Sequence, residues 1–298
     1  MDGVLLVDKP IGPTSHDIVA RARRVLGERQ IGHTGTLDPL ASGLLALVIG
    51  RATRLARFLS ASDKSYDAAI RLGVATDTYD AQGQPATAAY AGPMPSRDDV
   101  ERALDAFRGP FLQQPPAYSA KKIDGQRSYK LARAVPARPV LPAPVSVTAH
   151  TIDLIALEGD RVTLRVDCSA GFYIRSLAHD LGQRLGTGAH LTALRRTRSG
   201  AFTLDTAIAM DTLERDPGNA AAAIIPLSGM LLDFPSLVLT AEEVQRALHG
   251  RNVGPADSEK GVRPAYPFFR LLDQAGELLA IAEPVAGTDL LHPSIVLR

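Results

Sequence analysis

A glycine-rich loop at residues 32–43, GHTGTLDPLASG, holds the side chains best placed to do chemistry. Three glycines and one proline in twelve residues favour an irregular backbone that displays Asp38 and His33 outside helix or sheet pairing. Carboxylates and imidazoles can act as nucleophiles and as general acids or bases. An aspartate before proline is also a common turn former, so the loop alone leaves the role of Asp38 open.

Sequence patterns for other kinds of chemistry are missing. There is no G-x-x-x-x-G-K-[ST] phosphate loop, and the nearest approach to a dinucleotide fingerprint, at 186–191, lacks its third glycine. The zinc deaminase signature is absent, and the seven histidines are scattered without ligand spacing. Ser15, His16 and Asp17 are consecutive at a helix start, so they point apart and form no triad. We therefore expect neither a cofactor nor a metal.

Composition and charge narrow the classes of function. A single cysteine, Cys168, is typical of a reducing compartment, and no stretch approaches the roughly 20 apolar residues that span a bilayer, so we expect a cytoplasmic protein without membrane contact. The net charge of +1 conceals basic zones at 21–57, 121–138 and 161–200, which together hold 20 basic residues against five acidic ones. These zones either form one basic face for a polyanion or lie scattered over the surface, and charge alone does not decide.

Apolar periodicity predicts the elements that position the loop. Helices are expected at 15–26, 51–60, 96–107 and 174–185, with a short basic helix before residue 133. Strands are expected at 44–50, 66–72, 145–157, 161–168 and 191–204. Because helices and strands do not alternate regularly, the pattern favours an α+β fold around a mixed or antiparallel sheet.

A length of 298 residues favours two domains. After Pro226 the chain changes to a strand, a short helix and two short strands, at 268–273 and 276–284. This pattern predicts a large domain at 1–230 and a small β-rich domain at 235–298.

The loop at 32–43 resembles the catalytic loop of the TruB family of pseudouridine synthases, which isomerise a uridine in the T loop of tRNA. Four further segments resemble that family's motifs in the same order: VDKPIGPTSHDIV, KSYDAAIRLGVATDTYDAQG, QQPPAYSAKKIDGQRSYKLAR and CSAGFYIRSLAHDLG. The resemblance covers residues 3–200, with a fainter likeness of 235–298 to a PUA-type RNA-binding domain. It implies a catalytic domain followed by a PUA-like domain, acting as a monomer on the T arm of tRNA without metal or cofactor.

The resemblance assigns catalytic roles to three residues. Asp38 is the nucleophile, Arg175 its ion-pair partner, and Tyr66 the ring that stacks on the target base. Moving uracil from an N-linked to a C-linked ribose requires a nucleophile but no redox partner. A neighbouring guanidinium keeps a carboxylate ionised in a pocket dry enough to hold a base. On the residues alone, Arg175 is also explained as a surface arginine at a helix terminus.

Binding roles follow from the same resemblance. Extruding a base from a folded RNA loop costs unstacking energy, which aromatic and apolar contacts offset. Tyr173 and Leu194 occupy the family's positions for this, His33 a position that contacts the RNA loop, and Lys9 the floor of the pocket. Leu194 is equally compatible with a strand core and His33 with a loop histidine bonded within the protein. The candidates for phosphate contacts are Lys121, Lys122, Arg195 and Arg196.

The sequence departs from the family's usual pattern at Phe172, where Thr or Ser is frequent, so a bulkier ring stands next to Tyr173. Three functions remain in competition. The leading one is a cofactor-free tRNA uridine isomerase. The others are an RNA-binding or RNA-folding protein that uses the same basic surface, and a carboxylate-dependent hydrolase of another substrate, which the charge zones disfavour.

Overall fold

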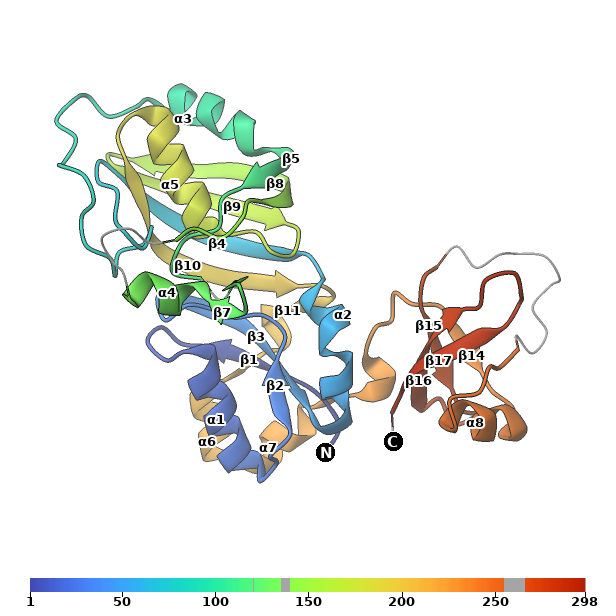
Figure 1. The fold of residues 1–298 in the computed structure, drawn as a ribbon. Coiled ribbons are helices and arrows are strands. Elements are labelled where there is room, and N and C mark those ends of the chain that lie inside the picture. Colours follow the sequence, from blue (N-terminus) through green and yellow to red (C-terminus); the bar gives the residue numbers. More distant parts are fainter. Residues whose placement is uncertain (120, 135–139, 255–265, 298) are drawn as a thin grey trace.

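Two main sheets organise the protein (Figure 1). A computed structural model describes residues 1–119, 121–134, 140–254 and 266–297. An eleven-stranded sheet takes its strands from Gly3 to Pro226, and a four-stranded sheet from Ser236 to Val296. Helices accompany both sheets, so the predicted α+β class is confirmed. The predicted boundary between residues 230 and 235 falls between the two sets of strands and stays a prediction.

The large sheet is mixed. Its main path is β12-β1-β3-β10-β4-β9-β8-β5, with β11, β13 and β2 paired to β10, β1 and β3. The pairs β1–β12 and β3–β10 are parallel, and the other pairs on this path are antiparallel. The strands are β1 (Gly3–Lys9), β2 (Ile31–His33), β3 (Ala41–Ile49), β4 (Lys64–Leu72), β5 (Gly109–Gln113), β8 (Val145–Glu158), β9 (Arg161–Cys168), β10 (Ala189–Ser199), β11 (Phe202–Thr203), β12 (Ile208–Ala209) and β13 (Ile225–Pro226).

The helices predicted for this region lie close to their expected positions, and the structure adds further short ones that were not predicted. They are α1 (Ser15–Leu26), η1 (Gly50–Leu55), α2 (Ala56–Ser60), α3 (Arg97–Leu104), η2 (Asp105–Phe107), α4 (Ser128–Ala134), α5 (Ile174–Leu185), η3 (Leu204–Thr206), α6 (Met210–Arg215), α7 (Pro217–Ala222) and η4 (Leu227–Gly229). Helix α1 begins at the expected capping box, in which the Thr14 amide donates to Asp17 Oδ2 at 2.8 Å and the Asp17 amide to Thr14 Oγ1 at 3.1 Å. It ends at Gly27, whose φ of 63° suits glycine. No helix in the described ranges is long and apolar enough to cross a membrane.

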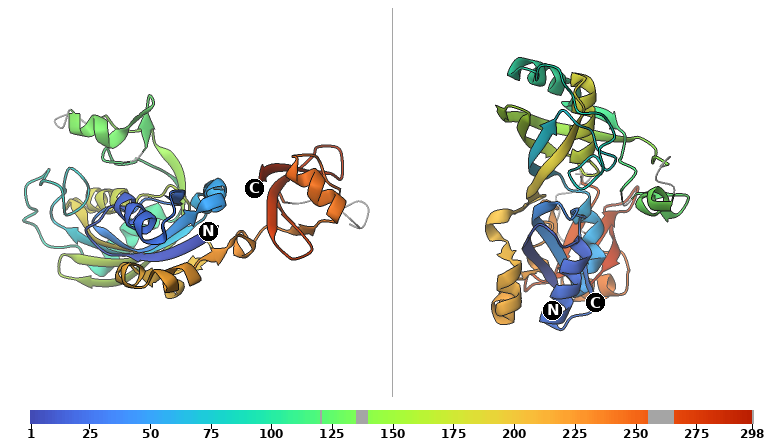
Figure 2. Two further views of the ribbon diagram at one scale, coloured as in Figure 1. Left: turned by 90° about the horizontal axis from the view of Figure 1, so that it is seen from below. Right: turned by 90° about the vertical axis from the view of Figure 1, so that its left-hand side faces the viewer.

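A small hairpin stands away from the large sheet. It consists of β6 (Lys122–Ile123) and β7 (Gln126–Arg127) and leads into α4; Figure 2 shows this green segment projecting from the body in its left-hand view. Its exposed side chains include Lys122, Arg127 and Lys130.

Two apolar clusters hold α5 and α1 on the large sheet. One apolar cluster lies between α3, α5 and strands β4, β8, β9 and β10, with Leu177 and Leu181 of α5 fully buried in it. A second lies beneath α1, where Ile18 and Ala22 pack against β1 and β3. Burial of this apolar surface stabilises α1 and α5 on the sheet.

In its described residues, the C-terminal region is a four-stranded sheet with one helix. Its elements are β14 (Ser236–Val238), α8 (Ala241–Leu248), β15 (Phe269–Leu272), β16 (Leu278–Pro284) and β17 (Leu291–Val296). Leu271 and Ala280 pack in a cluster with Ala247 of α8, whereas Ile281 belongs to a cluster that continues into Leu55 of η1. The small sheet therefore packs both on its own helix and on η1 and α2.

Candidate active site

Three adjacent strands bring distant motifs together. Parallel pairing of β3 and β10 sets Leu194 opposite Ala41, and antiparallel pairing of β10 and β4 sets Arg196 opposite Tyr66. Asp38 lies three residues before Ala41 in the loop that enters β3. The central strands thus place the glycine-rich loop beside the stacking candidate.

Hydrogen bonds anchor the loop on both sides. Ser15, the first residue of α1, accepts from the Leu37 amide at 2.8 Å and donates to the Leu37 carbonyl at 3.1 Å. On the other side Arg196, which is 3 % exposed, donates to the carbonyls of Leu44 at 2.7 Å and Gly35 at 3.1 Å. Charge-assisted bonds of this kind hold an irregular backbone in one conformation.

Gly43, which ends the loop motif, is required by close packing. Its φ is 98°, and a Cβ atom at this position would lie 2.3 Å from the Arg196 carbonyl oxygen. Only glycine allows β3 and β10 to approach this closely.

The start of α5 is held by the segment that contains QQPPAYS. The Gln113 side chain accepts from the Tyr173 amide at 2.8 Å and donates to the Tyr173 carbonyl at 3.0 Å. Ser176 Oγ donates to the Gln114 carbonyl at 2.6 Å. These bonds fix the first turn of the helix, where Arg175 lies.

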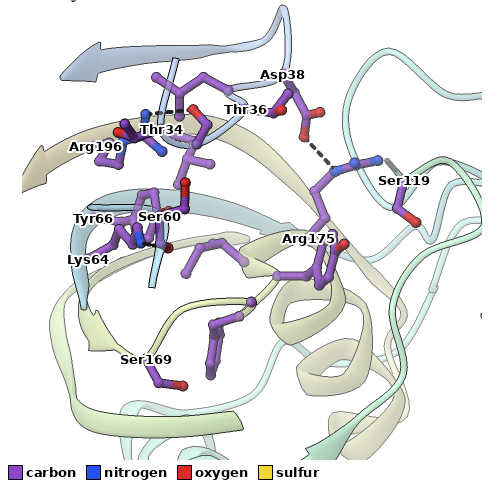
Figure 3. Close-up of a pocket in the computed structure, with 17 residues that line it drawn as sticks. Thr34, Thr36, Asp38, Ser60, Lys64, Tyr66, Ser119, Ser169, Arg175 and Arg196 are labelled. Atoms are coloured by element: carbon purple, nitrogen blue, oxygen red, sulfur yellow. Dashed lines mark hydrogen bonds and ion pairs between the residues drawn. The ribbon is translucent and has the colours of Figure 1, made fainter. Parts of the chain in front are cut away.

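A pocket of about 300 Å³ opens at the junction of the loop, β4, β10 and α5, and 17 residues line it (Figure 3). Asp38 and Arg175 meet at its edge, with Arg175 Nε 2.9 Å from Asp38 Oδ2. The Arg175 side chain is 7 % exposed and that of Asp38 is 39 % exposed. The structure therefore brings the two residues into contact, and the carboxylate remains accessible to a ligand.

Further partners fix the position of the Arg175 guanidinium. Its guanidinium donates to the carbonyls of Thr78 at 3.1 Å and Tyr118 at 2.9 Å, and lies 3.7 Å from Asp80 Oδ2. Each contact takes a different N–H group or direction, which a planar five-donor fork permits. Asp80 is buried, and sequence reasoning missed it, although it stands in the TDTYDAQG segment.

An unusual backbone conformation places the Thr78 carbonyl and Asp80. Tyr79 between them has φ 65°, and its ring stacks on His179 of α5 with centroids 3.8 Å apart and an interplanar angle of 14°. A left-handed conformation is costly for a bulky residue and persists only where its surroundings enforce it. The stack supplies one such constraint, one helical turn beyond Arg175.

Aromatic side chains line the pocket. Tyr66 is 9 % exposed, and burial raises the pKa of its phenol, so the hydroxyl stays protonated near neutral pH. Burial likewise raises the pKa of Tyr173. Leu194 also lines the pocket while packing against the core, so both interpretations of this residue describe its position. Phe172 lines it as well and packs edge-on against Phe111, with centroids 5.8 Å apart.

Lys9 and His33 lie next to the pocket but are not among its lining residues. Lys9 Nζ is buried and donates to the carbonyls of Pro10 at 2.8 Å and Ala41 at 2.7 Å, and burial lowers its pKa to about 8. Burial also lowers the pKa of the half-buried His33, which favours the neutral imidazole. Their predicted contacts with substrate stay predictions.

The four candidate phosphate contacts occupy different environments. Lys121 is half-buried and Lys122 exposed on the projecting hairpin, and neither forms an ion pair with another described residue. Arg195 pairs with Asp8, its Nη2 lying 2.7 Å from Asp8 Oδ2. Arg196 differs most from the expectation: phosphate contact requires accessibility, but its guanidinium is buried beneath the loop. Lys64, which was not singled out, also lines the pocket, and burial lowers its pKa to about 8.

No cluster of three or more His, Cys, Asp or Glu side chains suited to a metal ion occurs in the described part of the chain.

Comparison with known proteins decides the family. A model described as TruB family pseudouridylate synthase, N-terminal domain, matches residues 23–174, and a tRNA pseudouridylate synthase B C-terminal domain matches residues 175–232. The chain belongs to the TruB family. It is an enzyme, a pseudouridine synthase of the isomerase class. The family resemblance predicted from the five motifs is thereby confirmed.

Relatives of this TruB family member match over its full length. It is 44 % identical to tRNA pseudouridine synthase B of Solibacter usitatus (strain Ellin6076), with 100 % of each chain covered. It is 41 % identical to the protein of that name from Pseudomonas syringae pv. syringae (strain B728a), with 100 % of this chain and 96 % of the relative covered.

Solved structures share the TruB fold. A Cbf5-Nop10-Gar1 complex contains a chain that is 28 % identical, with a TM-score of 0.74 over 99 % of this chain and 85 % of that one. An H/ACA RNP bound to a substrate RNA containing 2'-deoxyuridine contains a chain that is 26 % identical, with a TM-score of 0.73 and the same coverage.

Proposed function

We propose that this enzyme converts a uridine in the T loop of tRNA to pseudouridine, with Asp38 as the nucleophile and without metal or cofactor. The observation that carries the proposal is the 2.9 Å ion pair between Asp38 and Arg175 at the edge of a pocket that Tyr66 lines. Relatives named tRNA pseudouridine synthase B support tRNA as the substrate.

The reaction is balanced without any co-reactant. The bond between ribose C1′ and N1 of uracil breaks, a bond between C1′ and C5 forms, C5 loses a proton and N1 gains one. A nucleophile is needed to hold the nucleotide covalently while the ring turns over. Asp38 combines accessibility with a fixed cationic neighbour, which suits it to this step.

The pocket supports base flipping. Its lining by Tyr66, Tyr173 and Leu194 offers aromatic and apolar contact that offsets the few kcal/mol of unstacking. Of the predicted substrate contacts, these three lie in the pocket wall. His33 and Lys9 would act from just outside the pocket. His33 would contact the loop of the RNA, and Lys9 would support the protein backbone at Ala41.

The T arm would lie across the face of the pocket and beneath the projecting hairpin. The accessible cations proposed to contact phosphate are Lys121 and Lys122 at that hairpin and Arg195, which also pairs with Asp8. The small C-terminal sheet is proposed to be a PUA-like RNA-binding module. We further propose a monomer that works in the cytoplasm, where its tRNA substrate is found.

Incubation of the purified protein with unmodified tRNA transcript, followed by mapping of any pseudouridine, tests the function. Asp38→Asn keeps the shape of the side chain, and we expect it to abolish turnover while tRNA binds within about tenfold of the parent, because phosphate contacts dominate affinity. Retained turnover in the variant would refute the nucleophile assignment. Loss of the parent's activity in excess EDTA, with recovery on adding metal, would refute the metal-free mechanism.

A further inference from the structure

The stacked rings of Tyr79 and His179 form a contact that the proposed mechanism does not use. Their centroids lie 3.8 Å apart with an interplanar angle of 14°, and both side chains are half-buried. Burial raises the pKa of Tyr79 and lowers that of His179, so both rings are uncharged near neutral pH. Neither ring lines the pocket, so any effect of the stack on the reaction passes through other residues.

The segment around Tyr79 meets helix α5 at two points. Arg175 and His179 are four residues apart on α5, so their side chains lie on the same face, one turn apart. Tyr79 packs on the second of them. The first donates to the Thr78 carbonyl at 3.1 Å and lies 3.7 Å from Asp80 Oδ2. The two neighbours of the tyrosine thus hold the guanidinium, while its own ring holds the next turn of the helix.

The backbone at Tyr79 needs support to keep this arrangement. Its φ of 65° is costly for a residue with a bulky side chain, because Cβ then lies close to the following carbonyl oxygen. On one side the segment is bonded to β10: the Leu191 amide donates to the Tyr79 carbonyl at 3.0 Å, and the Ala81 amide donates to the Leu191 carbonyl at 2.9 Å. The stack holds the opposite side, which faces α5.

We propose that His179 is a positioning residue of the reaction, because its ring holds Tyr79 in the left-handed conformation. The backbone held in this way presents a carbonyl and a carboxylate to Arg175, and Arg175 directs the Asp38 carboxylate. The inference rests on the proposed function, since it takes Asp38 to be the nucleophile. It adds a ring outside the pocket on which the geometry of the ion pair depends.

Substitutions at His179 test whether the ring matters. His179→Ala removes the stack, and we expect the single-turnover rate of pseudouridine formation to fall about tenfold, equivalent to about 1.4 kcal/mol. Affinity for tRNA should stay within about twofold, because the ring lies outside the pocket. His179→Phe restores a flat ring and should react within about twofold of the parent. Gln183→Ala, at an exposed position one turn further along α5, is the matched control and should leave the rate unchanged.

Substitutions at Tyr79 separate the ring from the backbone. Tyr79→Ala and Tyr79→Gly both remove the stack, but only glycine adopts a positive φ without steric cost. We therefore expect the glycine variant to react at least about threefold faster than the alanine variant. Adding His179→Ala to Tyr79→Gly should slow the reaction no further, because no stack remains to be lost. A glycine variant as slow as the alanine variant would overturn the proposal.

Other outcomes also decide the matter. A His179→Ala rate close to that of an active parent would show that the bonds to Leu191 suffice, and would overturn the proposal whether or not the melting temperature falls. So would a His179→Phe variant as slow as His179→Ala. An unchanged rate with weakened tRNA binding would make His179 an RNA contact instead. A parent that forms no pseudouridine would refute the proposed function, and this inference with it.

Discussion

At the scale of single residues, the site depends on one guanidinium with diverging partners. Arg175 donates to two carbonyls, pairs with Asp38 and faces Asp80, so it fixes the direction of the Asp38 carboxylate and joins three chain segments. A group so placed affects orientation as well as charge.

Arg175→Lys tests whether the orientation of Asp38 or the charge beside it matters more. The ammonium keeps the charge, but one nitrogen cannot reach Asp38, the Thr78 carbonyl and the Tyr118 carbonyl together, so we expect the single-turnover rate to fall about 100-fold. Arg175→Met should be slower still, because it removes the charge as well. Single-turnover kinetics and tRNA affinity are measured for both variants, and affinity should stay within about tenfold. Unchanged rates with binding weakened by orders of magnitude would identify Arg175 as a phosphate contact instead.

The sequence predicted some residues of this site and missed others. Asp38 and Arg175 came from motifs, and the structure brings them into contact. Asp80 did not, because its approach to Arg175 depends on the left-handed backbone at Tyr79, which no local pattern announces. The sequence also did not predict the burial of Arg196. An arginine in a basic strand is usually exposed, and only the pairing of β10 shows that this one lies beneath the loop.

At the scale of elements, regular periodicity was the reliable signal. Helices α1 and α5 have the predicted bounds, since each has an apolar face and ends at a glycine. The strand predicted at 191–204 is a hairpin of β10 and β11 that turns at Gly200. Strands β1, β5 and β17 and helices α6 and α7 were not predicted. Strand β1 is buried on both faces and so lacks alternation, while β17 contains a proline.

Helix α5 carries a carboxylate that makes stability depend on pH. Burial raises the pKa of Asp180 to about 6, above the 3.8 of the unfolded chain. The folded state therefore binds more protons between pH 4 and 6, and its free energy of unfolding falls as pH rises through that window. Asp180→Asn removes this dependence. When the pH is raised from 4.5 to 7.5, the free energy of unfolding of the variant should therefore rise by about 1–2 kcal/mol relative to that of the parent.

Urea unfolding of parent and variant at these two pH values measures the effect. Asp153→Asn, at an exposed position of β8, is the matched control for the change of a carboxylate to an amide. An advantage of Asp180→Asn that is the same at both pH values would contradict titration of Asp180 as the cause.

At the scale of the whole molecule, the small sheet packs directly on η1 and α2 of the preceding region. Arg51 donates to the Leu297 carbonyl at 3.3 Å, Arg54 donates to the Val296 carbonyl, and Arg57 pairs with Glu283 at 3.7 Å. Beneath these contacts one apolar cluster runs from β1 and β3 through η1 and α2 into β16 and β17. The small sheet thus packs on η1 and α2. These helices directly precede β4, the strand that carries Tyr66.

A shared core predicts that the two parts unfold together. Ile281 of β16 and Leu55 of η1 are each 0 % exposed and lie in the same cluster, one on either side of the junction. Ile281→Ala and Leu55→Ala should each cost about 2–5 kcal/mol, and calorimetry should show one transition that both substitutions move to lower temperature. If calorimetry resolved two transitions, with Ile281→Ala moving only one and Leu55→Ala only the other, the parts would be independent. Such a result would leave the contacts of Arg51 and Arg54 as surface bonds between separate folding units.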